Sequence, residues 1–528
     1  MKERLHHLTR WLILGILFIQ IGLPLISLAT HVSAADISKV FRAPQFLPML
    51  WNSVYSTTLA TVVSVGLALV LAWCLHRSQI RHKNLLALLF TVPMLIPSIS
   101  HGMSLTLLFG DNGVITNLTG LNIHLFGLTG IVLGATLYAF PSAFLMLTDS
   151  FRYEDYTTYE VAQVLGLSKL QQARQITLPN LKKPLIATVF AVFTMVFTDY
   201  GVPLVVGGKM TTLPVYMYRE VVGLLDTSKG GVLGLVLLLP AVLAFVIDLL
   251  NSETAQAGTV MKAFTVRKNN LRDFIASILC WGSALLLLLP LATFGVLCFV
   301  NRYPIDFSFS LTNLIASYRL GVGGYLLNSL FIALTTALVG TALAYGTAYF
   351  TARSKRTFSS MALHLISLVT LSVPGIVLGL SFMLLFQGSL LYGTFAILIS
   401  VNLIHFFASP YLMAYNALLK LNKNFEDVAG TLGITRFQLL RDVLFPCTYD
   451  TVFEMFGYIF ANAMVTISAV SFLANFRNMP LALLIPQFDS QALIGPIAVI
   501  SVVILIVNVS MKLLIFFLKC QFRRQGTL

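Results

Sequence analysis

Two stretches of this sequence decide the fold: residues 160–179 read EVAQVLGLSKLQQARQITLP, and residues 427–446 read DVAGTLGITRFQLLRDVLFP. Each copy opens with an acid, Glu160 in the first and Asp427 in the second. Such a repeat predicts that the chain contains two copies of one structural unit. Aligned without gaps, the copies share Val161/Val428, Ala162/Ala429, Leu165/Leu432, Gly166/Gly433, Gln171/Gln438, Arg174/Arg441 and Pro179/Pro446.

Both stretches resemble the cytoplasmic EAA loop of ABC-importer permeases, in which Glu-Ala-Ala is followed by a spaced glycine and by an I-x-L-P ending. The first copy ends in this way, whereas the second has Val443 and Phe445 in place of Ile and Leu. We call the two stretches the first and second EAA-like loops. The resemblance implies two short helices joined at the glycine, a small alanine that permits close approach, and an acid that pairs with a basic residue of a separate ATPase. The docking residues implied are Glu160, Ala162, Gly166 and Pro179, with Asp427, Ala429, Gly433 and Pro446.

The resemblance also implies the partners and the cofactors. Two copies of an ABC ATPase would contact one chain, and an extracytoplasmic substrate-binding protein would deliver the solute. ATP and Mg²⁺ would be bound by the ATPase, with no cofactor on this chain. The only Gly-Lys pair, Gly208-Lys209, does not fit a phosphate-binding loop, since Pro203 takes the place of its first glycine and Met210 follows the lysine. We therefore expect a transport subunit rather than an enzyme.

The composition is that of a membrane protein. Of 528 residues, 57% are hydrophobic and 10% charged, and the mean hydropathy is +0.86. Soluble domains carry about 25% charged residues. The net charge of +14 would suit nucleic acid, but the basic residues fall in short loops between apolar runs. They therefore indicate a lipid bilayer as the partner and no nucleic acid.

The apolar runs predict an all-α membrane protein with about 12 transmembrane helices. Each run approaches the ~20 residues that cross a bilayer, and the runs are continuous rather than alternating. The first run is longer than the core of a signal peptide, so we expect a retained helix. The runs are 11–30, 52–75, 85–109, 126–149, 184–206, 230–250, 274–300, 327–351, 361–386, 393–416, 448–472 and 492–518.

The distribution of Lys and Arg predicts the orientation. With a cytoplasmic N-terminus, 25 of the 34 basic residues lie on the cytoplasmic side and 8 outside, while Lys512 lies within the last run. Because basic residues favour the cytoplasmic side, both termini and both EAA-like loops are expected there. We therefore expect a multi-pass protein of the bacterial cytoplasmic (inner) membrane.

The internal repeat extends well beyond the loops. Residues 50–78 align with 326–354, and residues 96–110 align with 373–387. The sequence thus predicts two tandem six-helix permease halves, related by a pseudo-two-fold axis along the membrane normal. Prolines and glycines of the third and ninth runs are expected to break helical regularity there. The matched residues include Asn52/Asn328, Ser53/Ser329, Arg77/Arg353, Pro97/Pro374 and Gly102/Gly379, and the predicted division is 1–250, a cytoplasmic linker 251–271, and 272–528.

Polar residues inside the runs are candidates for a translocation path. Asp199 lies near the outer end of the fifth run and could instead cap or pair within the protein. His101 fits an interhelical hydrogen bond as well as a contact with solute. No cluster has the spacing of metal ligands or of a catalytic triad. The path candidates are Asp199, Thr198, Thr466, Ser468 and His101.

The resemblance can be narrowed to permeases with both halves on one chain. Residues 198–223, 237–248 and 462–473 look most like the 2-aminoethylphosphonate permeases, which implies that substrate. Ferric-iron and thiamine or polyamine permeases are the alternatives within the superfamily. An ion-coupled secondary transporter also uses twelve spans and two-fold repeats, but it has no need for paired docking loops.

Overall fold

The computed structural model describes residues 2–120, 123–152, 154–251, 264–266, 268–354, 357–422 and 424–525. Most of the predicted linker, residues 252–263 and 267, lies outside the described residues. The helices of the first half are α1 (Lys2–Leu17), α2 (Leu23–His31), α3 (Ala34–Phe41), α4 (Phe46–Arg77), α5 (Lys83–Thr91), α6 (Ser98–Phe109), α7 (Val114–Thr119), α8 (Leu128–Arg152), α9 (Thr157–Val164), α10 (Lys169–Gln172), α11 (Leu178–Phe197), α12 (Gly201–Val206), α13 (Leu213–Tyr218) and α14 (Thr227–Asn251).

The second half follows a similar order, with α20 and α21 in the place of α8, and adds an antiparallel hairpin in which Val300 pairs with Phe309 and Arg302 with Asp306. This hairpin is not among the elements expected from the sequence. The elements are α15 (Asn270–Leu297), β1 (Val300–Arg302), β2 (Asp306–Phe309), α16 (Thr312–Arg319), α17 (Val322–Ala352), α18 (Phe358–Val369), α19 (Gly375–Phe386), α20 (Phe395–His405), α21 (Ala408–Lys420), α22 (Asn424–Thr431), α23 (Arg436–Leu439), α24 (Phe445–Val465), α25 (Leu484–Ser490) and α26 (Ile494–Gln525).

The predicted all-α membrane fold is confirmed. Within the described residues, seven helices are long and apolar enough to cross a membrane, and three bent helix pairs bring the number to 10. The two remaining expected spans coincide with α14 and α24. In a bilayer, every backbone polar group must be bonded internally, which is why continuous apolar runs fold as helices.

The third and ninth expected spans are broken, as their prolines predict. The helices meet at 98° where α5 gives way to α6, and at 111° where α18 gives way to α19. Pro97 and Pro374 stand directly before α6 and α19. A proline keeps the preceding residue out of the helical region, and Ile96 and Val373 are indeed extended.

The tenth span also bends, by 52° between α20 and α21, which the sequence analysis did not predict. Pro410 lies in the first turn of α21 and has no N–H to donate to the carbonyl of Phe406. In the first half, Pro141 lies at a similar distance before the EAA-like loop, inside α8, which is one continuous helix. A proline in this region is therefore tolerated within a helix in one half and coincides with a break in the other.

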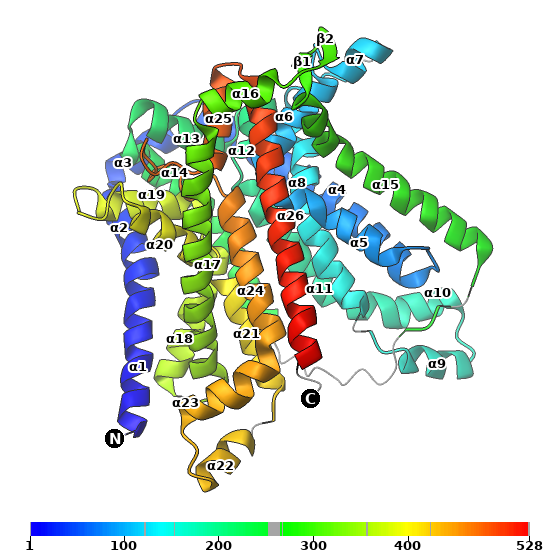
Figure 1. The fold of residues 1–528 in the computed structure, drawn as a ribbon, viewed down its shortest axis with the longest axis vertical. Coiled ribbons are helices and arrows are strands. Elements are labelled where there is room, and N and C mark those ends of the chain that lie inside the picture. Colours follow the sequence, from blue (N-terminus) through cyan, green and yellow to red (C-terminus); the bar gives the residue numbers. More distant parts are fainter. Residues whose placement is uncertain are drawn as a thin grey trace.

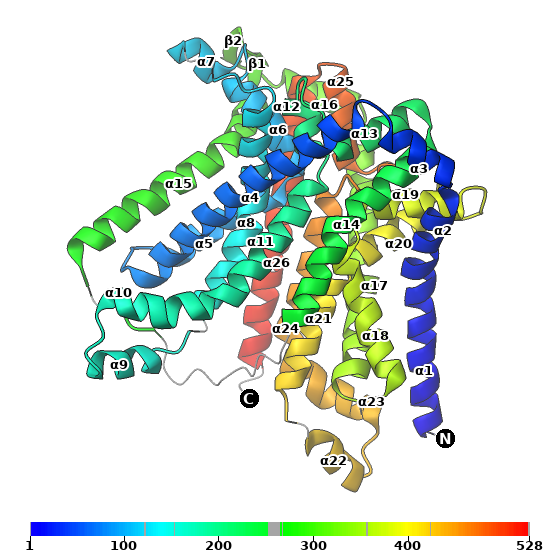
Figure 2. The same ribbon diagram turned by 180° about the vertical axis from the view of Figure 1, so that it is seen from behind.

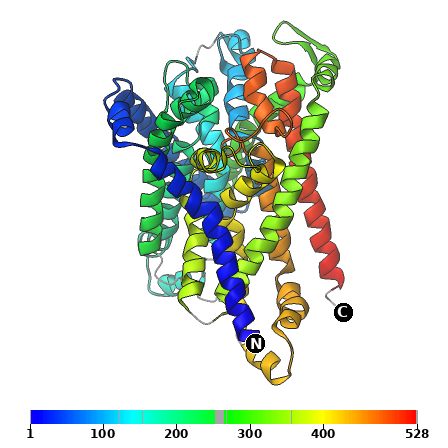
Figure 3. The ribbon, with the colours of Figure 1, turned by 90° about the vertical axis from the view of Figure 1, so that its left-hand side faces the viewer.

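The first helix of each half packs on the other half. α1 and α2 contact α17, α18 and α19, whereas α15 contacts α4, α5 and α6. On α15, Ala276, Cys280, Ala284 and Leu287 lie on one helical face and belong to the buried cluster of α4 and α8. In Figure 1, α1 and α15 lie on opposite flanks, and Figure 3 shows α1 crossing the helices of the second half. The two sequence halves are thus exchanged at their first helices and do not form separate bundles.

Matched residues make matched contacts. Ser53 Oγ accepts a 2.7 Å hydrogen bond from the Leu213 N–H, and Ser329 Oγ accepts one of the same length from the Leu481 N–H. These bonds hold the corresponding segments before α14 and α26 against α4 and α17. The neighbouring bonds also correspond, from Asn52 Nδ2 to Thr211 O (3.2 Å) and from Asn328 Nδ2 to Met479 O (3.3 Å).

Both EAA-like loops lie at one end of the molecule. Figures 1 and 2 show α9 and α22 at this end, together with the free ends of α1 and α26. The β1–β2 hairpin, α7 and α16 lie at the opposite end. The predicted topology requires both loops and both termini to lie on the same side of the membrane, and this arrangement meets that requirement.

Candidate functional site

Each EAA-like loop is built from two short helices joined by a tight turn at glycine. Gly166 (φ 75°) and Gly433 (φ 69°) both adopt the left-handed conformation. In the first loop, the Leu167 N–H bonds Ala162 O at 3.0 Å and the Gly166 N–H bonds Gln163 O at 3.0 Å. This pair of bonds is the Schellman motif, which ends a helix with a residue that is most often glycine. The second loop makes the corresponding bonds, with Ile434 to Ala429 at 2.9 Å and Gly433 to Gly430 at 3.4 Å.

The shared glutamine of the repeat starts the second short helix. Ser168 and Gln171 form a capping box at α10, in which each side chain bonds the backbone N–H of the other residue. Thr435 and Gln438 do the same at α23. A capping box satisfies two donors that a helix start would otherwise leave unpaired. The two loops therefore share both their turn and their second helix start.

The final proline of each loop opens a membrane helix. Pro179 and Pro446 lie in the first turn of α11 and α24, directly after a π-helical turn. Proline has no backbone N–H to donate to the carbonyl four residues earlier, and a π-helical turn stands at this point of each helix. The loops thus lead without a break into the fifth and eleventh spans.

The acids and alanines of the loops differ in their surroundings. Glu160 is half-buried near the start of α9 and Asp427 is exposed near the start of α22, where a helix favours negative charge. Ala162 and Ala429 are buried, and Ala162 packs with Tyr156 and other aromatic residues of this chain. The close approach that these alanines permit is therefore to the rest of the permease chain.

Each loop also presents exposed apolar side chains, which the sequence analysis did not single out. Leu165 is 72% exposed and its counterpart Leu432 is 67% exposed, while Leu170 and Phe437 are 81% and 69% exposed. The signal was available, because apolar residues recur at matched positions of a loop outside the membrane. We call these sets the apolar loop faces: Val161, Val164, Leu165 and Leu170 in the first loop, and Val428, Leu432, Ile434 and Phe437 in the second.

A matched arginine anchors each loop. Arg77, at the end of α4, forms a buried ion pair with Glu154 and bonds the Tyr159 hydroxyl at 3.0 Å. Arg353, after α17, binds both carboxylate oxygens of Glu426 at 2.6 and 2.5 Å. Fork-like pairs of this kind fix orientation as well as energy. The sequence matched the two arginines but did not assign them this role.

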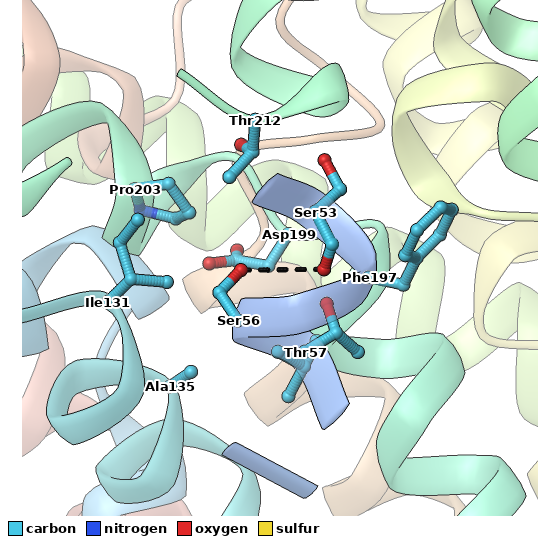
Figure 4. A pocket seen from close by; sticks show the side chains of 10 residues that line it. Ser53, Ser56, Thr57, Ile131, Ala135, Phe197, Asp199, Pro203 and Thr212 are labelled. Carbon is cyan, nitrogen blue, oxygen red and sulfur yellow. Dashed lines mark hydrogen bonds between the residues drawn. The ribbon is translucent and has the colours of Figure 1, made fainter. Parts of the chain in front are cut away.

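The path candidate Asp199 caps a helix in this structure. One carboxylate oxygen accepts a bond from Ser98 Oγ at 2.7 Å, and the other accepts the Val202 N–H of α12 at 3.0 Å. Asp199 also borders a small cavity with room for about one water molecule (Figure 4). Hydroxyl groups of Ser53, Ser56, Thr57 and Thr212 line the same cavity.

Corresponding breaks after α11 and α24 meet where the two halves contact each other. Tyr200 bonds Ser471 across this contact at 2.6 Å, and a Cβ at Gly201 would touch Ile467. A serine faces a glycine at this place in each half, but the two residues have traded positions. In the first half Ser98 precedes Gly201, and a Cβ at Gly201 would overlap Ser98 Oγ. In the second half Gly375 precedes Ser468, and a Cβ at Gly375 would overlap Ser468 Oγ.

The other path candidates lie on either side of this contact. Thr198 bonds the Thr194 carbonyl of its own helix at 2.9 Å, and Thr466 is buried directly after α24. His101 is buried on α6 and its Nε2 bonds the Pro93 carbonyl at 3.1 Å, within its own bent span. The structure thus gives Asp199 and Thr466 corresponding places directly after α11 and α24, whereas His101 belongs to the packing of the third span.

Comparisons with known proteins agree with this geometry. The family described as "Binding-protein-dependent transport system inner membrane component" matches residues 64–252 and 340–523. The ferric transport system permease protein FbpB of Actinobacillus pleuropneumoniae is 24% identical over 445 residues, which cover 80% of this chain and 64% of that protein. The probable ABC transporter permease protein y4fN of Sinorhizobium fredii is 23% identical over 479 residues, which cover 85% of this chain and 83% of that protein.

A shorter match is the thiamine transport system permease protein ThiP of Brucella abortus, 23% identical over 219 residues, or 38% of this chain and 40% of that protein. The two family matches fall one in each predicted half, and together they cover most of the chain. The chain therefore belongs to the family of inner membrane components of binding-protein-dependent transport systems, with two copies of the family's domain on one polypeptide.

Proposed function

We propose that this chain is the transmembrane permease subunit of an ATP-driven importer, with two ATPase copies docked at its two EAA-like loops. The observation that carries the proposal is that the two loops have the same turn and the same helix cap and lie at the same end of the molecule. The family supplies the rest, since its members work with a binding protein and a separate ATPase. Two loops on one chain favour one permease chain per complex.

The apolar loop faces give this docking a physical basis. Burying a leucine stabilises an interface by about 1.5–3 kcal/mol, and each loop offers at least two large apolar side chains that are more than two-thirds exposed. Glu160 and Asp427 lie beside these faces and would pair with basic groups of the ATPase. We place the loops and both termini in the cytoplasm because of the predicted charge distribution, which would leave the β1–β2 hairpin on the side of the binding protein.

A pair of matched variants tests the docking. In Leu165→Ser/Leu432→Ser, both apolar loop faces lose a leucine, and each loss should weaken ATPase binding roughly tenfold or more. Leu118→Ser is the control, because Leu118 is 80% exposed on α7 at the other end. The measurement is the amount of ATPase that co-purifies with each variant in detergent. Equal recovery with both variants would remove the loops as docking sites.

For the substrate, we keep 2-aminoethylphosphonate as the first candidate. The support is the resemblance of residues 198–223 and 462–473, which include Asp199, Thr466 and Ser468. Asp199 could receive the amine of such a zwitterion only after it leaves Ser98 and the Val202 N–H. A role of this kind would therefore belong to an opened conformation of the path.

Ferric iron is the second candidate, favoured by the name of the long relative FbpB. Uptake of labelled 2-aminoethylphosphonate, ferric iron and thiamine into cells that carry the complete system would separate the candidates. Adding each of the other two solutes without label, in excess over the labelled one, would show whether uptake is specific. Failure to take up 2-aminoethylphosphonate would remove that assignment and leave the importer function intact.

A further inference from the structure

The segment that precedes α15 contacts the first EAA-like loop through Phe264. The Arg77 guanidinium carbon lies 3.4 Å from the centroid of the Phe264 ring. The same ring stands edge-on to Tyr156 and Tyr159, with centroid distances of 4.9 and 5.2 Å. Phe264 therefore belongs to the contacts that surround the anchoring arginine, although it comes from the connection between the halves.

The cation beneath this ring is almost fully removed from solvent. The Arg77 side chain is 10% exposed, and its Nη2 bonds Glu154 and the Tyr159 hydroxyl. Its Nη1 is buried and bonds no acceptor among the described residues. A desolvated cation gains most from an aromatic face, so we expect the Phe264 ring to stabilise this guanidinium.

The anchored side chains extend through the whole first loop. Burial and the Glu154 hydrogen bond raise the pKa of Tyr159 to about 12. The Tyr159 hydroxyl therefore stays protonated and donates a hydrogen bond to Glu154. The same hydroxyl lies 2.8 Å from Thr177 Oγ1, in the π-helical turn that precedes α11. Arg77 thus contacts the first short helix and is linked, through the Tyr159 hydroxyl, to the end of the loop.

Further hydrogen bonds hold the connecting segment to the end of α4. Gln79 Nε2 donates to the Val266 carbonyl at 2.8 Å, and the Gln79 N–H donates to the Asp273 carboxylate at 3.0 Å. Asp273 lies in the first turn of α15, which itself packs on α4, α5 and α6. The first loop, the end of α4 and the start of α15 are therefore tied together.

The second loop is anchored differently. The residue that corresponds to Tyr159 is Glu426, which binds Arg353 directly. The remaining Arg353 donors reach the carbonyls of Leu421 and Asn422 at 2.8 and 2.7 Å. In the described structure, this arginine is satisfied by its own half, whereas Arg77 is completed by a ring from the connection to the other half.

We infer that Phe264 is a positioning residue of the first ATPase contact, and that the connection between the halves holds the first EAA-like loop more firmly than the second. The ring acts through the side chains that it contacts, Arg77, Tyr156 and Tyr159. The part that concerns the ATPase rests on the proposed function. The holding of the loop is a property of this chain alone and can be tested separately.

Hydrogen exchange of the full chain in lipid nanodiscs tests the holding of the loop. Phe264→Ala should raise exchange in residues 157–177 by between about 2-fold and 30-fold, and leave residues 424–444 unchanged. Phe264→Tyr keeps the aromatic face and should behave as the wild type. Phe274→Ala is the matched control, since Phe274 is 64% exposed on α15. Unchanged exchange in Phe264→Ala, or an equal rise in both loops, would overturn the inference.

The second arm measures ATPase binding and the ATP hydrolysed per solute transported, for the complex with the co-purified ATPase. Phe264→Ala should hydrolyse several-fold more ATP per solute transported, and Phe264→Tyr should restore the wild-type ratio. A merely structural role would lower both rates together and leave this ratio unchanged, which would overturn the positioning role. If no ATPase binds the wild-type chain, the proposed function fails, and the exchange experiment still decides whether Phe264 holds the loop.

Discussion

Substitution of Gly433 by alanine should weaken ATPase binding, while substitution of Gly430 by alanine, three residues earlier in the same loop, should not. Gly433 has φ 69° and closes the Schellman motif, whereas Gly430 lies inside α22. A Cβ added at either glycine meets nothing within 4 Å. The two substitutions therefore differ only in the backbone conformation that they require.

The structure gives the magnitude. A residue other than glycine in the left-handed region costs about 1–2 kcal/mol, and with free space around the Cβ no steric term is added. At Gly430, alanine instead favours the helix by about 1 kcal/mol. If the ATPase binds only the turned loop, Gly433→Ala lowers its affinity by up to about 5- to 30-fold. Asn tolerates the left-handed region, so Gly433→Asn should lose less.

The assay is binding of the co-purified ATPase to nanodisc-embedded permease, titrated for the wild type and the three variants. The expected order of affinity is Gly430→Ala at or above wild type, then Gly433→Asn, then Gly433→Ala. Gly166→Ala should act at the first loop for the same reason, since its φ is 75° and its Cβ would also be free. Equal affinities for Gly430→Ala and Gly433→Ala would refute the link between the turn and docking.

Three further outcomes are expected. Native mass spectrometry of the complex should find one copy of this chain with two ATPases, because the repeat supplies both loops; two permease chains per complex would contradict this. Glu160→Lys combined with Asp427→Lys should abolish uptake while membrane insertion, followed by fractionation, stays normal; normal uptake would reject a role of the acids in docking. Gly375→Ala should destabilise the protein by about 1–3 kcal/mol because its Cβ would overlap Ser468 Oγ, and Ser468→Gly should recover part of this loss in a double-mutant cycle of thermal unfolding.

Much of the fold could be predicted because its causes are local. A span is read from its own apolar run, and the breaks at Pro97 and Pro374 follow from the ring of each proline. The left-handed turns at Gly166 and Gly433 follow from the glycine at the same place in both copies. In each case, the residue that decides the geometry lies within the element that it shapes.

The exchange of the first helices had no such local cause. Against lipid or against another helix, an apolar face of α15 looks the same in sequence, because lipid tails are as apolar as leucine. Only the small buried residues Ala276, Cys280 and Ala284 mark its packing on the first half, and they do not name the partner. The role of Asp199 was open for the same reason, since its partners Ser98 and Val202 come from a distant helix and from the following turn.

The two halves keep one geometry with different residues, and the differences gather where the chain would act. At the loops, each arginine pairs with a carboxylate, but only Arg77 is also covered by the Phe264 ring among the described residues. At the crossing, Asp199 corresponds to Thr466 and Tyr200 to Ile467. The repeated frame allows similar movements of both halves. If Asp199 leaves Ser98 and faces the path in an opened conformation, the path would have a carboxylate on one side and the Thr466 hydroxyl on the other, and we expect such a path to suit a small solute whose own two ends differ.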